Sequence, residues 1–133
     1  MSDDRYEEGM RVRRAVLGNA HVQRAEANKT AFDADFQRFL VETAWGSVWT
    51  RPGLDTKSRH MITIAMLAAL GRENELGLHL RATRNTGITR DEVKEVLLQV
   101  AVYAGIPAAN SAYAIAKKVF ADEKEPPSDI ENS

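Results

Sequence analysis

Apolar residues recur at a helical spacing from one end of the chain to the other, and the alternating pattern of a β-strand is nearly absent. We therefore expect an all-α fold, a single-domain helical bundle of about six helices over residues 1–123. Residues 124–133 contain two prolines and several acidic side chains, which predicts a disordered acidic tail. The expected helices cover residues 4–17, 31–45, 56–70, 73–86, 90–104 and 107–122.

Turn-forming residues mark the boundaries of these helices. Residues 19–29 carry a mixed polar pattern, which predicts a connector. Gly46 weakens the second helix, and Pro52 with Gly53 predicts a turn after it. The pattern at Thr89–Glu92 is a capping box, so the fifth helix should open there.

The third and sixth helices are expected to pack differently. The third, residues 56–70, has apolar residues on nearly every face, which predicts the buried centre of the fold. The sixth follows a stop at Gly105 and begins at Pro107. Small residues along it should let another helix approach closely. These are Ala108, Ala109, Ser111, Ala112, Ala114 and Ala116.

Composition and charge exclude several classes of protein. The 133 residues include 18 lysines and arginines, 19 acidic residues and no cysteine, for a net charge of −1. The missing cysteines exclude disulfides, thiolate metal sites and cysteine nucleophiles. No apolar run approaches the roughly 20 residues of a membrane span. The chain also lacks the excess of basic residues that is typical of nucleic-acid-binding proteins. We expect a cytoplasmic protein with a small-molecule or protein partner.

His79 is the first candidate for chemistry. It lies among Leu76, Leu78 and Leu80, and Glu75 precedes it by one helical turn. At that spacing a carboxylate can orient an imidazole and raise its pKa. The alternative is a partly buried histidine whose hydrogen bond to a carboxylate serves only structure.

The other two histidines occupy different surroundings. His60 is one turn into an apolar helix, so it must cap the helix entrance or face a pocket. His21 falls in the expected connector, where exposure is the commoner outcome. Three histidines with Glu42 or Glu75 have the donors for zinc, but no His-x-x-x-His pair is present. We therefore expect no metal site.

Residues 42–54 form the most unusual stretch. Glu42, Trp45 and Trp49 fall at i, i+3 and i+7, on one face if the helix continues past Gly46. With Arg51 nearby, the two tryptophans could line a pocket for a flat anionic ring. They could equally fill the core or a subunit contact.

Five stretches resemble the carboxymuconolactone decarboxylase family: residues 10–22, 44–54, 78–82, 87–105 and 107–112. The later blocks are shared with a wider superfamily that includes alkylhydroperoxidase D, so they indicate the fold. The pattern Trp-Gly-x-x-Trp-x-Arg-Pro-Gly-Leu is narrower and indicates the decarboxylases. The resemblance covers nearly the whole chain apart from the acidic tail.

The resemblance implies an alkylhydroperoxidase D-like bundle that assembles into a ring-shaped oligomer, typically a hexamer. The peroxidase relatives carry a Cys-x-x-Cys pair before the histidine that aligns with His79. Those two positions are Arg72 and Glu75 here, so peroxidase activity through thiols is not expected. A relay glutamate of the relatives falls near His60, which therefore does not inherit that role.

The implied reaction is cofactor-free decarboxylation of 4-carboxymuconolactone to 3-oxoadipate enol-lactone and CO2, in the protocatechuate branch of the β-ketoadipate pathway. The substrate's own ring double bond and lactone carbonyl accept the electrons, so no metal or organic cofactor is implied. The protein must hold the retained carboxylate, stabilise the carbonyl oxyanion and protonate the carbon α to the carbonyl.

We assign these tasks to eight residues. His79 is the expected proton donor, because imidazole titrates near neutral pH. Glu42 or Glu75 would orient it, and His60 is a further catalytic candidate. The expected substrate-binding residues are Trp45, Trp49, Arg51 and Arg81. An N-terminal arginine, Arg13 or Arg14, could reach a neighbouring subunit's pocket.

Two other functions stay open at this point. One is another lactone-transforming enzyme of the same superfamily. The other is a non-catalytic helical oligomer that binds a partner, in which His79 would be structural.

Overall fold

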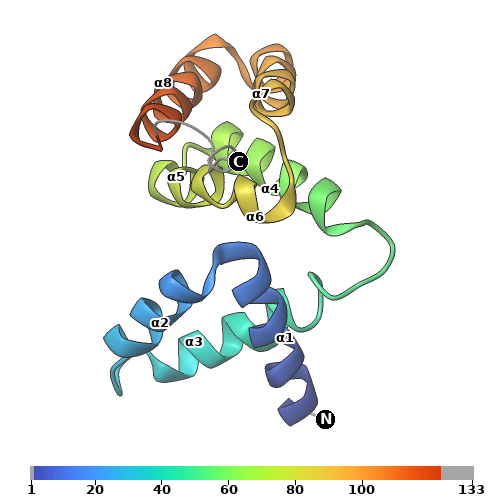
Figure 1. Ribbon diagram of the computed structural model, residues 1–133, viewed down its shortest axis with the longest axis vertical. Helices are drawn as coiled ribbons and strands as arrows, with labels where there is room; N and C mark the ends of the chain where they lie inside the picture. Colours follow the sequence, from blue (N-terminus) through green and yellow to red (C-terminus); the bar gives the residue numbers. More distant parts are fainter. Residues whose placement is uncertain (1, 124–133) are drawn as a thin grey trace, which may run out of the picture. The chain divides into compact units, whose positions relative to one another are not determined.

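The computed structural model describes residues 2–123, which are almost entirely helical (Figure 1). No β-strand occurs within this range. The expected all-α fold is confirmed, with eight α-helices and one π-helical segment in the described residues rather than about six helices. They are α1 (Ser2–Leu17), α2 (Asn19–Asn28), α3 (Ala34–Leu40), η1 (Val41–Trp45), α4 (Thr56–Leu70), α5 (Glu73–Arg81), α6 (Thr83–Thr86), α7 (Arg90–Ala104) and α8 (Ile106–Asp122).

The contacts of the chain group into two compact units, and each is described by itself. Unit 1 ends at Arg59 and contains α1, α2, α3 and η1. Unit 2 begins at His60, within α4, and contains α5 to α8. The expected tail, residues 124–133, lies outside the described residues.

The expected connector at residues 19–29 is wrong, because residues 19–28 form α2. Val22 is the one buried residue of this helix. Val22 is fully buried and packs against Met10 of α1 and Val41 of η1. Gly18, with a φ of 95°, separates α1 from α2 in a conformation that other residues rarely adopt.

The second expected helix starts later than predicted, at Ala34, and changes to π-helix at Val41. Its end is shaped by a close approach of backbones between α1 and η1. A Cβ on Gly9 would lie 2.5 Å from the carbonyl oxygen of Val41, and a Cβ on Gly46 would collide with Arg5. Only glycine permits this contact.

The prediction that residues 56–70 form the buried centre of the fold is wrong for the single chain. Within α4 the buried residues are His60, Ile64 and Ala68, which follow one stripe of the helix. Apolar residues on the other faces remain exposed, among them Met66 and Leu70. Apolar character on every face of α4 is therefore not explained by packing within one chain.

The fourth expected helix, residues 73–86, is divided at Ala82 into α5 and α6. The hydroxyl of Thr83 donates a hydrogen bond of 2.7 Å to the carbonyl of Leu80. At this division a side chain therefore bonds to a backbone carbonyl of α5. Gly87, with a φ of 82°, ends α6 in the left-handed conformation.

The core of unit 2 lies where α5 and α7 meet α8, and α7 and α8 run side by side in Figure 1. Leu76, Leu80 and Leu97 are its largest fully buried leucines. Of the small residues of α8, Ala109, Ala112 and Ala116 are buried, whereas Ser111 and Ala114 are exposed, so only one side of the helix is packed closely. The capping box at Thr89 is present, and the sixth helix begins one residue before Pro107, at Ile106.

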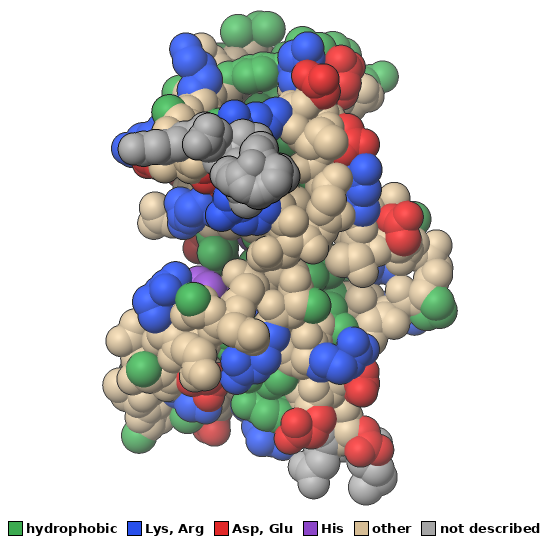
Figure 2. All heavy atoms as spheres, in the orientation of Figure 1, with side chains coloured by type: hydrophobic (Ala, Val, Ile, Leu, Met, Phe, Trp, Pro, Cys, Tyr) green, Lys and Arg blue, Asp and Glu red, His purple; other side chains and the backbone are tan. Residues whose placement is uncertain are grey.

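Charged side chains of both signs are interspersed on the face shown in Figure 2. Among the helices of residues 2–123, none combines the length and the apolar character needed to cross a membrane.

Candidate functional site

The eight residues singled out from the sequence fall into two groups of four. Unit 1 holds Glu42, Trp45, Trp49 and Arg51. Unit 2 holds His60, Glu75, His79 and Arg81.

A pair of buried histidines joins α4 to α5 in unit 2. The ring centroids of His60 and His79 lie 5.2 Å apart, with an angle of 67° between the ring planes. His60 has no exposed surface, and His79 is 9% exposed. The edge-to-face contact restricts the rotation of both rings, so each holds the other in place.

His60 is held from its other side by Thr86, a residue that the sequence did not suggest. Its Nδ1 lies 2.7 Å from the hydroxyl oxygen of Thr86, on α6. Burial lowers the pKa of His60 to about 4, although a hydrogen bond with the His79 backbone opposes the shift. His60 is therefore neutral at physiological pH. No local signal could have found Thr86, which is 26 residues away in the chain.

Glu75 and Arg81 lie on α5 but face solvent. No hydrogen bond or ion pair links Glu75 with His79 among the contacts of the described residues. The i, i+4 spacing therefore places a carboxylate one turn from the imidazole without producing contact between them. The roles of Glu75 and Arg81 stay predictions.

The two tryptophans of unit 1 stack on each other, with ring centroids 4.7 Å apart and an interplanar angle of 25°. Trp45 is buried against Val12 and Val16, whereas Trp49 is half-buried. Of the two alternatives for the tryptophans, filling the core describes Trp45 and lining a pocket describes Trp49.

That pocket of unit 1 has a volume of about 390 Å³. Trp49, Pro52 and Leu54 give it apolar walls, and Arg51 contributes a guanidinium. The remaining lining residues are Arg11, Val12, Ala15, Val16, Thr50, Asp55 and Thr56. Arg11 is already paired with Glu8 at 2.8 Å. A flat ring bearing a carboxylate fits this combination of apolar walls and a cation.

Glu42 is engaged within its own unit. Its carboxylate pairs with Arg38 Nε at 3.0 Å, and the side chain of Glu42 is 15% exposed. The Arg38 guanidinium also lies 4.8 Å from the centroid of the Tyr6 ring. The ion pair therefore engages the Glu42 carboxylate with a neighbour one helical turn away, within unit 1.

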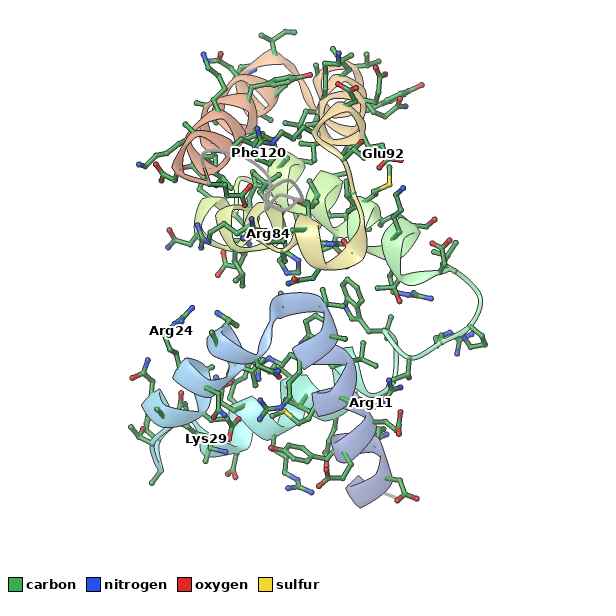
Figure 3. All side chains as sticks on the ribbon, in the orientation of Figure 1. Arg11, Arg24, Lys29, Arg84, Glu92 and Phe120 are labelled. Carbon is green, nitrogen blue, oxygen red and sulfur yellow. The ribbon has the colours of Figure 1, made fainter. Side chains whose placement is uncertain are left out.

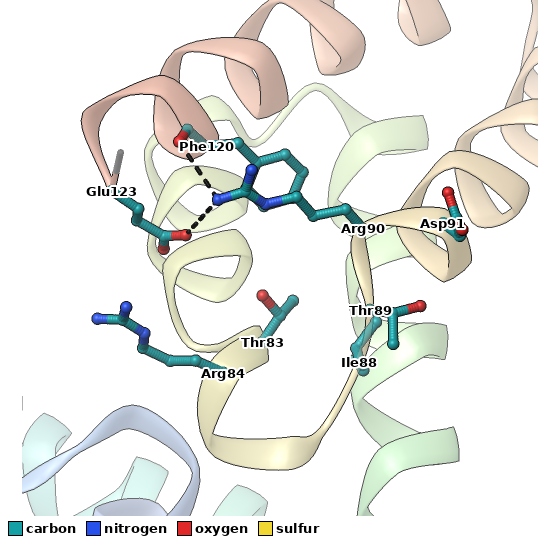
Figure 4. Close-up of a pocket in the computed structure, with 8 residues that line it drawn as sticks. All are labelled: Thr83, Arg84, Ile88, Thr89, Arg90, Asp91, Phe120 and Glu123. Atoms are coloured by element: carbon teal, nitrogen blue, oxygen red, sulfur yellow. Dashed lines mark hydrogen bonds and ion pairs between the residues drawn. The ribbon is translucent and has the colours of Figure 1, made fainter. Parts of the chain in front are cut away.

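A second pocket, of about 440 Å³, lies in unit 2 where α6 and α7 face the end of α8 (Figure 4). Arg90 contributes a cation to it, and the guanidinium lies 4.7 Å from the Phe120 ring centroid and 3.5 Å from the Glu123 carboxylate. None of the eight predicted residues lines it. Arg90 ties α7 to α8 and is already compensated, so this pocket is not our candidate site.

Among the described residues, no group of three or more histidine, aspartate or glutamate side chains is arranged to hold a metal ion.

Comparison with known proteins places this chain among decarboxylases. The sequence model of the carboxymuconolactone decarboxylase family matches residues 34–118. A 4-carboxymuconolactone decarboxylase of Acinetobacter baylyi is 51% identical over 123 residues, which cover 92% of each chain. The nitrosuccinic acid decarboxylase npaB of Metarhizium robertsii is 40% identical over 88% of this chain and 82% of its own length. A 4-carboxymuconolactone decarboxylase of Pseudomonas putida is 48% identical over 42 residues, 32% of this chain and 88% of the relative.

Proposed function

The chain belongs to the carboxymuconolactone decarboxylase family, and from this we propose that it converts 4-carboxymuconolactone to 3-oxoadipate enol-lactone and CO2. The observation that carries the proposal is the identity to the Acinetobacter decarboxylase over nearly the whole of both chains. The protein is then a carboxy-lyase of the protocatechuate branch of the β-ketoadipate pathway. We place it in the cytoplasm, where such a catabolic step takes place.

The chemistry of the substrate defines what the protein must do. When the ring carboxylate leaves as CO2, its electron pair moves through the ring double bond onto the lactone carbonyl oxygen. The resulting dienolate takes one proton at the carbon α to the carbonyl, which gives the enol-lactone. The protein needs a proton donor, hydrogen bonds to the oxyanion and a cation for the carboxylate that stays.

The histidine pair separates the two imidazoles into different roles. Because the pKa of His60 is about 4, it holds no proton to give at neutral pH. We therefore assign proton donation to His79 and the positioning of its ring to His60, which contacts it edge to face. That Glu42 or Glu75 orients the His79 ring stays a prediction.

The tryptophan pair suits the apolar part of the reaction. Trp49 lines its pocket, and the ring of Trp45 stacks on the ring of Trp49. An apolar wall favours the loss of a charged carboxylate as neutral CO2. Arg51 and Arg81 are the cations predicted for the retained carboxylate, and both are exposed.

The relative named for nitrosuccinic acid supports the same division of tasks. That compound also carries a carboxylate on a carbon attached to an electron-accepting group, with a second carboxylate one methylene away. Loss of CO2 there moves charge onto nitro oxygens instead of a lactone oxygen. A site that holds one carboxylate, stabilises an oxyanion and returns a proton suits both molecules.

We further propose a ring-shaped homohexamer. The apolar side chains left exposed in unit 2 support assembly, because single chains rarely leave so many uncovered. They are Ile62, Met66, Leu70, Leu98, Val102, Tyr103 and Ile106. A groove of about 270 Å³ lies among them, lined by Ala65, Met66, Ala69, Gln99, Val100, Tyr103 and Ala104. Light scattering at micromolar concentration should give several times the mass of one chain, and a monomer mass would exclude a ring.

The function is tested by following lactone consumption in the ultraviolet and CO2 release together, with purified protein and no added cofactor. We expect both signals to rise in parallel and to survive exhaustive chelation. Lactone consumption without CO2 would indicate a different lactone enzyme. Activity lost with EDTA and restored by zinc would rule out the cofactor-free reaction.

A further inference from the structure

Arg13 occupies a position that α1 otherwise gives to apolar residues. One turn on either side of it, Met10 and Val16 are buried in the core of unit 1. Arg13 is only 6% exposed, comparable to these neighbours. A guanidinium thus lies in the interior of a helical layer, where cations are rare unless paired.

Two of the three guanidinium nitrogens of Arg13 have no acceptor among the described residues. Its Nε and Nη1 are buried, and no described residue accepts a hydrogen bond from either atom. Glu26 of α2 exerts the strongest attraction on it, but the Glu26 carboxylate is bonded to Lys29 Nζ at 3.0 Å. Burial lowers the pKa of Arg13 in spite of that attraction. Desolvation therefore outweighs every favourable charge around the guanidinium.

A guanidinium with two buried nitrogens that make no hydrogen bond destabilises the folded protein, and it cannot become neutral to avoid that cost. Unlike histidine, arginine cannot lose its proton at physiological pH. Replacing such a charge with an apolar side chain of similar size often stabilises a protein. An arginine at this position therefore indicates an anion that compensates it in the working protein.

We propose that Arg13 binds the carboxylate that the substrate keeps throughout the reaction. This inference rests on the proposed decarboxylation. The guanidinium fork matches a carboxylate with two parallel hydrogen bonds. An ion pair also gains more in a desolvated place than at the exposed Arg51 or Arg81, where water competes.

The role predicts a specific kinetic signature. The retained carboxylate has the same charge in the substrate, the transition state and the product, so Arg13 binds all three alike. Its loss should raise KM roughly 10- to 100-fold, as expected for hydrogen bonds to a charged group, and leave kcat nearly unchanged.

The test uses Arg13→Met, which keeps the length and apolar stem of the side chain but removes the charge. Arg24→Gln is the matched control, because Arg24 is exposed on α2 and points away from α1 and α3 in Figure 3. We expect Arg13→Met to have an unchanged or higher Tm together with the raised KM. Arg24→Gln should match the wild type in both.

Two outcomes would overturn the inference. A folded Arg13→Met enzyme with the wild-type KM would show that Arg13 does not bind substrate. A large fall in Tm, with or without a change in KM, would assign Arg13 to folding.

A binding measurement separates this inference from the proposed reaction. Succinate, which carries carboxylates but does not decarboxylate, should raise the Tm of the wild type and of Arg24→Gln but not of Arg13→Met. If the wild type turns over no lactone yet shows this pattern, the proposed function fails and the anion site stands. No shift in the wild type, or an equal shift in Arg13→Met, would refute the anion site.

Discussion

Each unit of this protein buries a basic side chain, and the two respond to burial in opposite ways. His60, in unit 2, has its Nδ1 against the hydroxyl of Thr86 and a pKa lowered to about 4, so it is buried as a neutral ring. Arg13, in unit 1, keeps its charge and has no described acceptor at Nε or Nη1. The difference follows from intrinsic proton affinity, because imidazole gives up its proton at little cost and guanidinium does not.

The two side chains suit different tasks in the proposed reaction. The neutral, well-held His60 restricts the ring of His79, which suits a group that must deliver a proton along one direction. The charged, unsatisfied Arg13 suits a group that must attract an anion. We therefore expect substitution of His79 or its supports to lower kcat and substitution of Arg13 to raise KM.

The largest effect is expected at His79. His79→Ala should lose roughly two to four orders of magnitude in kcat, as for other general acids, with a small change in KM. His79→Gln keeps some hydrogen bonding but cannot donate a proton usefully, so it should be nearly as slow. Initial-rate assays on variants whose Tm has been checked give both kcat and KM. A folded, near-fully active glutamine variant would remove His79 from the mechanism.

Acid stability tests the neutrality of His60. Its pKa is about 4 in the folded protein, against an ordinary value of 6.5. Between these values the unfolded chain binds more protons, so stability falls as the pH falls from about 6.5 to about 4. The full loss is on the order of 3 kcal/mol.

Urea unfolding at a series of pH values measures this loss. His60→Gln can still bond Thr86 but does not titrate, and should lack that part of the slope. The same slope in the variant would show that His60 is not the group responsible.

A smaller effect on kcat is expected at Thr86. Thr86→Val preserves the shape of the side chain but removes the hydroxyl that contacts His60, and should lower kcat roughly 3- to 10-fold. Thr86→Ser restores the hydroxyl and should recover most of the loss. A serine variant as slow as the valine variant would mean that packing, and not the hydrogen bond, accounts for the effect.

The smallest effects are expected at the exposed arginines. Arg51→Gln and Arg81→Gln should each raise KM by about threefold or less, because solvent-exposed ion pairs contribute little. Comparison with Arg13→Met in the same assay ranks the three guanidiniums. A KM raised more by Arg51→Gln than by Arg13→Met would move the main anion contact to the pocket beside Trp49.

The sequence alone determined the features that depend on neighbouring residues. The helical class, the capping box at Thr89 and the stop at Gly105 were all predictable, because each depends on spacing or backbone conformation within a few residues. The family resemblance likewise followed from short blocks of sequence. These features needed no knowledge of what packs against them.

Tertiary structure decided the rest. Helix α2 (Asn19–Asn28) is stabilised by the burial of Val22 in the core of unit 1. The π-helical segment at Val41 packs closely on α1 because Gly9 and Gly46 have no side chains there. The contact between His60 and Thr86, and the burial of Arg13, depend equally on which helices pack together. Local pattern identifies which residues can carry charge or protons. Burial and contacts across the fold set the pKa of His60 and leave two nitrogens of Arg13 without an acceptor, and no local pattern contains that information.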